Sequence, residues 1–228
     1  MKWNNKFTYP KSSRSTEDGI RRYMLGETKL PSVTSILEAT KSEEEKASLA
    51  NWRTRTGEEL ATKIQQDASS RGSKMHAYLE SYLLARENLN FFESDDQYKI
   101  MAKEIIEKGI KNRLEEIWGL EATLAYPEKY AGTADCIGVY EGKETIIDFK
   151  QSNKPKKLEY VQNWFLQTAA YSLAHNVVYN TNINSCVILL CTVDKLFQEF
   201  KVDGSELLAY QNLFLGRLKQ FNEMNNLT

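Results

Sequence analysis

Apolar and polar positions alternate along residues 130–150, which is the pattern of two paired strands joined by a Glu-Gly-Lys turn. Successive side chains of a strand point to opposite faces, so Asp148 and Lys150 share one face and Phe149 points to the other. If the two strands pair, Asp135 approaches the face of Asp148. The hairpin therefore predicts two carboxylates with an ammonium group beside them, which is what a divalent cation and a developing anion both require.

The rest of the chain shows strand and helix patterns on both sides of this hairpin. Further strands are predicted over residues 5–9, 19–25, 120–126, 184–193 and 196–202. Helices are predicted over residues 33–37 with Ser32 as N-cap, 43–66, 70–86, 95–118, 158–179 and 205–224. The predicted break between helices 43–66 and 70–86 lies at Ser69-Ser70-Arg71-Gly72, and Gly119 ends helix 95–118. The apolar contacts of helix 43–66 are Leu49, Trp52, Leu60 and Ile64. This order predicts an α/β protein with a central mixed β-sheet flanked by helices and a helical N-terminal part.

Length and composition favour one globular domain. The chain has 228 residues, of which 41% are apolar and 27% charged. We expect a single domain over residues 1–228, with an N-terminal hairpin and helices (1–118), a sheet with one helix (119–202) and a C-terminal helix (203–228). No apolar run is long enough to span a bilayer and no signal peptide is recognisable, which favours an intracellular protein without membrane contact.

The net charge of −1 gives no overall attraction to phosphate, so any nucleic-acid contact has to be local. One local basic cluster consists of Lys150, Lys154, Lys156 and Lys157, although most such clusters are simply solvated charge. The three cysteines form no CxxC pair and support neither a disulfide framework nor a zinc site. We expect them to be buried thiols.

Helix 70–86 carries His76 and Glu80 one turn apart along the edge of its apolar face. A single helical histidine is more often structural than a ligand, and Glu80 could equally face solvent. Helix 158–179 places Trp164, Gln167 and Tyr171 away from its main apolar stripe, where they could form a second core contact or a functional face.

Four motifs occur in a defined order along the chain. They are an upstream helical histidine in Arg71-Gly72-x-x-x-His76-x-x-x-Glu80, a GxxD strand at 132–135, a DxK strand at 148–150 and a QxxxY helix at 167–171. Together they resemble the PD-(D/E)XK nuclease superfamily, specifically its RecB-like branch of exonucleases. Within that branch the chain is similar to small exonucleases of the mitochondrial genome-maintenance type and their bacteriophage relatives, and the segment 31–34 is reminiscent of the latter. The resemblance covers roughly residues 30–200.

The resemblance implies a restriction-endonuclease-like core and a metal-dependent deoxyribonuclease. Asp135 and Asp148 would be carboxylate ligands, His76 an imidazole ligand, and the Phe149 carbonyl a further oxygen. This ligand set suits Mg²⁺ or Mn²⁺, and Lys150 would orient the attacking water or stabilise the charge that develops on the phosphate. Glu80 and Glu121 are candidates of second rank.

The same resemblance implies DNA as the substrate, preferably with single-stranded ends. Gln167 and Tyr171 would contact the DNA backbone, Trp164 could stack a base, and Lys154, with Lys156 and Lys157, would contact phosphates. Some RecB-like nucleases bind an iron-sulfur cluster through four cysteines, and since that pattern is absent we predict no cluster.

Two alternatives stay open, namely an endonuclease of the same fold and a non-catalytic nucleic-acid-binding module. Replication or recombination proteins are conceivable partners, and a bacteriophage origin would place the protein in the cytoplasm of a bacterial host.

Overall fold

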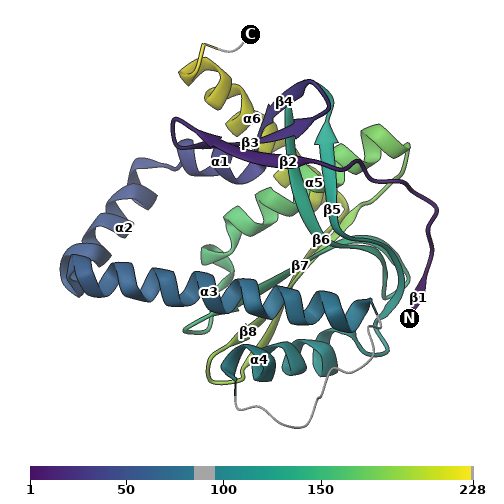
Figure 1. Ribbon diagram of the computed structural model, residues 1–228, viewed down its shortest axis with the longest axis horizontal. Helices are drawn as coiled ribbons and strands as arrows, with labels where there is room; N and C mark the ends of the chain where they lie inside the picture. The colour runs from purple at the N-terminus through teal and green to yellow at the C-terminus, as the bar shows by residue number, and fades with distance from the viewer. Residues whose placement is uncertain (85–95, 227–228) are drawn as a thin grey trace.

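The computed structural model describes residues 1–84 and 96–226, so the predicted helix end at Arg86 and helix start at Asp95 lie outside the described residues. Its main sheet has the strand order β1-β5-β6-β7-β8-β9 (Figure 1). These strands are β1 (Lys2–Trp3), β5 (Leu114–Tyr126), β6 (Tyr130–Tyr140), β7 (Lys143–Ser152), β8 (Ser185–Thr192) and β9 (Phe197–Asp203). The pairs β1–β5 and β7–β8 are parallel and the others antiparallel. The predicted α/β fold with a central mixed sheet of the restriction-endonuclease type is therefore confirmed.

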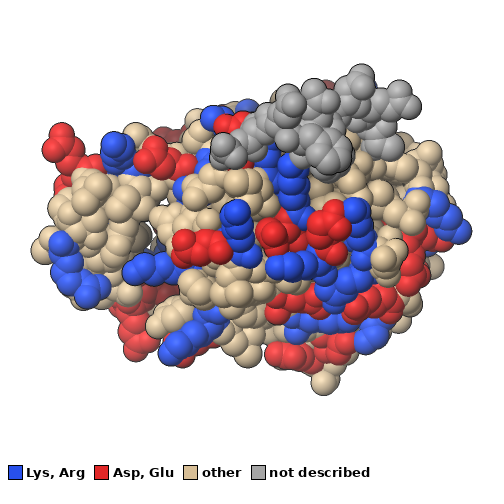
Figure 2. Space-filling view, turned by 90° about the horizontal axis from the view of Figure 1, so that it is seen from below, with Lys and Arg blue, Asp and Glu red and all other residues tan. Residues whose placement is uncertain are grey.

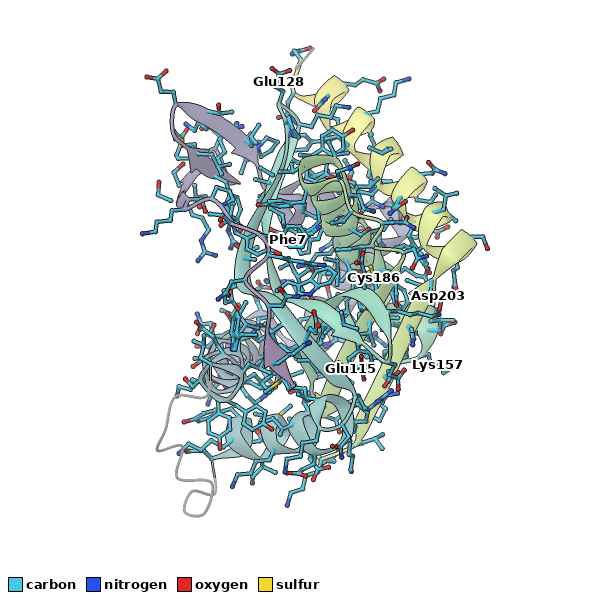
Figure 3. All side chains as sticks on the ribbon, turned by 90° about the vertical axis from the view of Figure 1, so that its right-hand side faces the viewer. Phe7, Glu115, Glu128, Lys157, Cys186 and Asp203 are labelled. Carbon is cyan, nitrogen blue, oxygen red and sulfur yellow. The ribbon has the colours of Figure 1, made fainter. Side chains whose placement is uncertain are left out.

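Helices cover both faces of this sheet (Figures 1 and 3). On one face α3 (Glu58–Leu83) and α4 (Gln97–Ile105) pack with one apolar core, and on the other α1 (Val33–Ala39), α5 (Gln162–Tyr179) and α6 (Gly204–Met224) pack with a second core. The remaining helical elements are α2 (Glu43–Thr56), a π-helical turn (Ile106–Ile110) and a 3₁₀ turn (Leu158–Tyr160). All eight residues of β8 are buried, as predicted for a doubly covered central strand.

A smaller antiparallel sheet lies beside the main one and consists of β2 (Ser13–Glu17), β3 (Ile20–Leu25) and β4 (Thr28–Pro31). It is fixed to β6 by a hydrogen bond between the hydroxyls of Tyr23 and Thr133 (3.0 Å) and by a β-bridge between Ser32 and Ala131. Ser32 accepts a hydrogen bond from the Ser35 N–H (3.0 Å), which confirms the predicted N-cap of α1.

The predicted strand over residues 5–9 is wrong. Its aromatic side chains are used differently: the Phe7 ring lies 4.9 Å from that of His175, and the Tyr9 hydroxyl is 3.1 Å from His175 Nε2. The segment is thus held by side-chain packing on α5 (Figure 3) and not by a strand ladder.

The predicted break in the long helical region is also misplaced. The break lies at Gly57, where α2 ends because the φ of 86° is outside the helical region. The next helix, α3, runs without interruption through residues 69–72, where the break was predicted. The Ser73 hydroxyl bonds back to the Ser69 carbonyl (3.1 Å), which accommodates a polar residue within an exposed helix. The predicted inward positions Leu49 and Leu60 are exposed, and α2 buries no residue.

Residues 95–118 do not form one helix. The helical stretch ends at Ile110, Asn112 adopts a φ of 60°, and β5 begins at Leu114. Leu114 and Ile117 are buried as predicted, but from a strand, because their spacing suits both periods. Gly119 lies inside β5 against the ring of Tyr9, where a β-carbon would come within 2.5 Å of a ring carbon.

The three cysteines are free and buried, as predicted. Within the part of the chain that the structure describes, no helix has the length and apolar character needed to cross a membrane. On the face shown in Figure 2, basic and acidic side chains are interspersed, in keeping with the small net charge.

Candidate active site

The candidate site lies where strands β6 and β7 stop pairing. Their ladder runs from the Tyr140–Lys143 pair to the Cys136–Ile147 pair. Beyond this point Asp135 Oδ2 accepts a hydrogen bond from the backbone N–H of Phe149 (2.8 Å). A carboxylate of the GxxD strand is thereby attached to the backbone of the DxK strand, and the predicted approach of these two motifs is realised.

Three potential ligands from three elements meet at this point. Nδ1 of His76 on α3 is 3.5 Å from Asp135 Oδ1 on β6 and 3.9 Å from Glu121 Oε1 on β5. One ligand atom from each residue can be chosen so that all lie within 4.8 Å of one another. Glu121 has a φ of 44°, an unusual conformation for a non-glycine residue within a strand, and such conformations are concentrated at functional sites.

Asp148 and Lys150 lie next to this cluster. The Lys150 ammonium forms an ion pair with Asp148 Oδ2, but not in a hydrogen-bonding geometry, and within the described residues this buried oxygen accepts no hydrogen bond. The ammonium is also 6.0 Å from the Trp164 ring centroid. A buried carboxylate oxygen without a hydrogen-bond donor is costly, and the Lys150 ammonium balances its charge without donating a hydrogen bond, so Asp148 Oδ2 can still accept a further ligand.

The surroundings raise the pKa values of two groups in the site. Burial and the negative charge of Asp148 raise the pKa of the Asp135 carboxyl to about 6. Burial alone would lower the pKa of His76, but the carboxylates of Asp135 and Glu121 outweigh it and raise the pKa. A bound cation would compete with protons for these groups, so any metal binding here should weaken as the pH falls.

The QxxxY motif packs directly on the GxxD motif. Gln167 Nε2 donates to the Tyr171 hydroxyl (3.1 Å), and Tyr171 is only 3% exposed. A β-carbon at Gly132 would lie 2.4 Å from a ring carbon of Tyr171, so this position needs glycine. Gln167, Tyr171, His76 and Asp135 line one pocket of about 140 Å³.

Trp164 and Lys154 line a different hollow on the other side of the site. This cleft of about 610 Å³ also includes Trp52 of α2 and Gln151 at the end of β7. The four predicted DNA contacts are therefore divided between two hollows along α5. Arg71 fixes α3 to the end of β7 here, since its Nε donates to Gln151 Oε1 (2.9 Å).

The structure changes the ranking of the second-rank acids. Glu121 belongs to the three-residue cluster, whereas Glu80 lines only a neighbouring open hollow with His76 and Glu121. Glu121 is the one charged residue of the predicted strand 120–126, which was its sequence signal. Arg14 and Arg21 line the same pocket as the cluster, and neither was predicted from the sequence.

Comparison with known proteins relates the chain to one group of exonucleases. No family model matches the chain. The mouse mitochondrial genome maintenance exonuclease 1 (Mus musculus) is 31% identical over 85% of this chain, and the human protein (Homo sapiens) is 27% identical over the same share. The chain spans 59% and 58% of the length of these two relatives. The crystal structure of an alkaline exonuclease from Laribacter hongkongensis is 13% identical, covers 86% of this chain and 91% of that one, and gives a TM-score of 0.39.

The mixed sheet, with its GxxD and DxK strands and the QxxxY helix packed on them, is consistent with the predicted resemblance to the RecB-like branch of the PD-(D/E)XK superfamily. The chain is a homologue of mitochondrial genome maintenance exonuclease 1, with 31% identity to the mouse protein.

Proposed function

We propose that the chain is a divalent-metal-dependent exonuclease that hydrolyses phosphodiester bonds at single-stranded DNA ends. This proposal rests mainly on one observation. Potential ligand atoms of His76, Glu121 and Asp135 lie within 4.8 Å of one another, next to the ion pair of Asp148 and Lys150. The names of the relatives, which are exonucleases, support the reaction type.

The residues present fit a hard divalent cation. The cluster offers one imidazole nitrogen and two carboxylates, and Asp148 adds a buried oxygen that accepts no hydrogen bond from the described residues. Mg²⁺ and Mn²⁺ both accept such ligands. When bound, the cation would lower the pKa of a coordinated water and neutralise charge on the scissile phosphate. The predicted role of the Phe149 carbonyl as a further ligand is part of this proposal.

The chain's own groups supply orientation and charge. The Phe149 N–H holds the Asp135 carboxylate in one position, which pre-organises that ligand. Lys150 holds its ammonium at Asp148, where it can donate to a phosphate oxygen or to the attacking water. Such pre-organised electrostatic contacts typically contribute about 100- to 1,000-fold in rate.

Two hollows along α5 would hold the strand. Gln167 and the hydroxyl of Tyr171 would contact the DNA backbone near the cut. In the larger cleft, the half-buried rings of Trp52 and Trp164 could stack bases of any sequence while Lys154 contacts a phosphate. Because rings can stack only on unpaired bases, contacts of this kind favour a single-stranded substrate.

The test is a digestion panel with Mg²⁺ or Mn²⁺ on linear and circular DNA, single- and double-stranded. We expect the wild-type protein to release nucleotides from linear single strands and to spare circles. Asp148→Asn and Lys150→Gln should each lose at least about 100-fold in rate. Lys201→Gln is the matched control, because Lys201 also pairs with an acid, Glu141, but far from the cluster in an exposed ion pair.

Each alternative has its own outcome in the same panel. Cleavage of circular single strands would indicate an endonuclease, and binding without cleavage across the metal series would indicate a binding module. Wild-type rates in Asp148→Asn or Lys150→Gln would contradict the site assignment. A role beside replication or recombination proteins remains a hypothesis on partners that this panel does not address.

A further inference from the structure

Two arginines of the small sheet face the same side as the tyrosine that anchors it. In the β2–β3 ladder Arg14 is paired with Tyr23, and Thr16 is paired with Arg21. Directly paired residues share one face of a sheet, and residues two apart on a strand do so as well. Arg14, Arg21 and Tyr23 therefore point to one side, where the Tyr23 hydroxyl meets Thr133 on β6.

The backbone that carries Arg21 is fixed at both of its polar groups. The Arg21 N–H donates to the Ser35 hydroxyl (2.9 Å), and the Arg21 carbonyl accepts from the Ser32 N–H (2.9 Å). Ser32 is in turn joined by a β-bridge to Ala131 of β6, four residues before the candidate ligand Asp135. The backbone of Arg21 is thus attached to the GxxD strand, so only the arginine side chain has to become ordered on binding.

Both guanidinium groups are available for a ligand. Neither Arg14 nor Arg21 makes an ion pair within 4.0 Å or a side-chain hydrogen bond with any described residue, and both residues are exposed. Yet both line the pocket of about 140 Å³ that also contains Asp135 and Glu121. A pocket lined by carboxylates and by unpaired guanidinium groups fits a ligand that carries negative charge next to a metal-bound group.

We propose that Arg14 and Arg21 form a phosphate-binding subsite, which binds one phosphate of the nucleic-acid strand next to the phosphate that is cleaved. This inference rests on the proposed function. A guanidinium is always charged and donates two parallel hydrogen bonds to phosphate oxygens, and such pairs are roughly twice as strong as neutral hydrogen bonds. The pocket of about 140 Å³ has more than four times the volume of about 30 Å³ that one water molecule takes up, so it has room for a phosphate. The subsite would fix how far the cleaved bond lies from the neighbouring phosphate.

The test measures binding without any metal. Affinity for a fluorescently labelled single-stranded oligonucleotide is measured by anisotropy in EDTA over a series of salt concentrations. For single strands, each phosphate contact contributes about 0.7 to the slope of log K against log salt. The double variant Arg14→Gln/Arg21→Gln should lose about 0.7 from this slope and about tenfold in affinity.

Arg22→Gln is the matched control. Arg22 lies between Arg21 and Tyr23 on β3, so its side chain points to the opposite face, and it does not line the pocket. It removes one positive charge from the strand that carries Arg21 and should leave slope and affinity unchanged. Circular dichroism of the double variant checks that the small sheet remains folded. If the folded double variant has the slope and affinity of Arg22→Gln, the subsite does not exist.

Three oligonucleotides identify the source of the phosphate: one with a 5′-phosphate, one with a 3′-phosphate and one with neither. If the double variant loses affinity only for the oligonucleotide with one kind of phosphorylated end, the subsite binds a terminal phosphate. If it loses the same affinity for all three oligonucleotides, the subsite binds an internal phosphodiester. Failure of the proposed function gives a different result, because the wild-type protein would then not cleave linear DNA in Mn²⁺. A wild-type protein that cleaves, with a double variant equal to Arg22→Gln, overturns the subsite alone.

Discussion

Replacing Gly132 by alanine tests whether the GxxD and QxxxY motifs are mechanically joined. The new β-carbon would lie 2.4 Å from one ring carbon of Tyr171 and 3.0 Å from the hydroxyl oxygen. Ordinary contacts begin at 3.4 Å, so the ring has to move by about 1 Å. Tyr171 is buried and bonded to Gln167, and therefore cannot move without disturbing its neighbours.

Overpacking of this kind typically costs about 1–3 kcal/mol. Since the φ of Gly132 lies outside the left-handed region, this cost comes from the ring contact alone. We expect Gly132→Ala to lower the free energy of unfolding in urea by that amount and to reduce nuclease activity through displacement of the Tyr171 hydroxyl. Tyr171→Ala removes the contact, so the double variant should be less destabilised than the sum of the single variants by about 1–3 kcal/mol.

Gly216→Ala is the control for the added methyl group. Gly216 lies on the exposed face of α6 with no atom within 4 Å of the new β-carbon, so its replacement should stabilise the helix by up to about 1 kcal/mol. Unchanged stability of Gly132→Ala, or strict additivity with Tyr171→Ala, would refute the contact as the reason for the glycine.

Two further predictions concern the metal cluster and the response to acid. Glu121→Gln should weaken Mn²⁺ binding in calorimetric titration by at least about tenfold, whereas Glu80→Gln, which lies outside the cluster, should change it by less; equal effects would contradict the ranking. Burial lowers the pKa of His175 from 6.5 to about 4, so folding favours its neutral form and stability is lost as the pH falls from 6.5 towards 4. Between about pH 7.5 and about pH 5, the free energy of unfolding measured with urea should therefore fall by about 2 kcal/mol more for the wild-type protein than for His175→Gln. The same pH dependence of this free energy in both proteins would exclude the role of His175.

Local patterns sufficed for the elements whose signal is short-range. The hairpin of β6 and β7 was predictable because a Glu-Gly-Lys turn separates two alternating runs, and β8 because an unbroken apolar run needs cover on both faces. The prediction of one helix over residues 95–118 was wrong because the spacing of Leu114 and Ile117 fits both a helix and a strand. Only Asn112, at a φ of 60°, marks the change of structure, and its side chain alone does not signal it.

The composition of the site was only partly predictable for a related reason. Asp135, Asp148 and Lys150 could be found because they occur in motifs on consecutive strands. Glu121 was predicted only in second rank and Arg21 not at all, since their importance comes from the register of β5 with β6 and from the docking of the small sheet on β6. Contacts across such distances in the chain leave no periodic pattern.

The absence of buried residues in α2 has a consequence for motion. An isolated helix of fewer than about 12–15 residues is marginal in water, and α2 has 14 residues, supported by the capping box of Ser42 and Glu45 and by polar contacts such as that of Asn163 with Glu45. Its amide hydrogens should therefore exchange with solvent through local opening, whereas those of β8 should exchange only when the whole core unfolds. Because Trp52 is carried by α2, one wall of the larger cleft can separate from α5 while the carboxylates on β6 and β7 keep their positions.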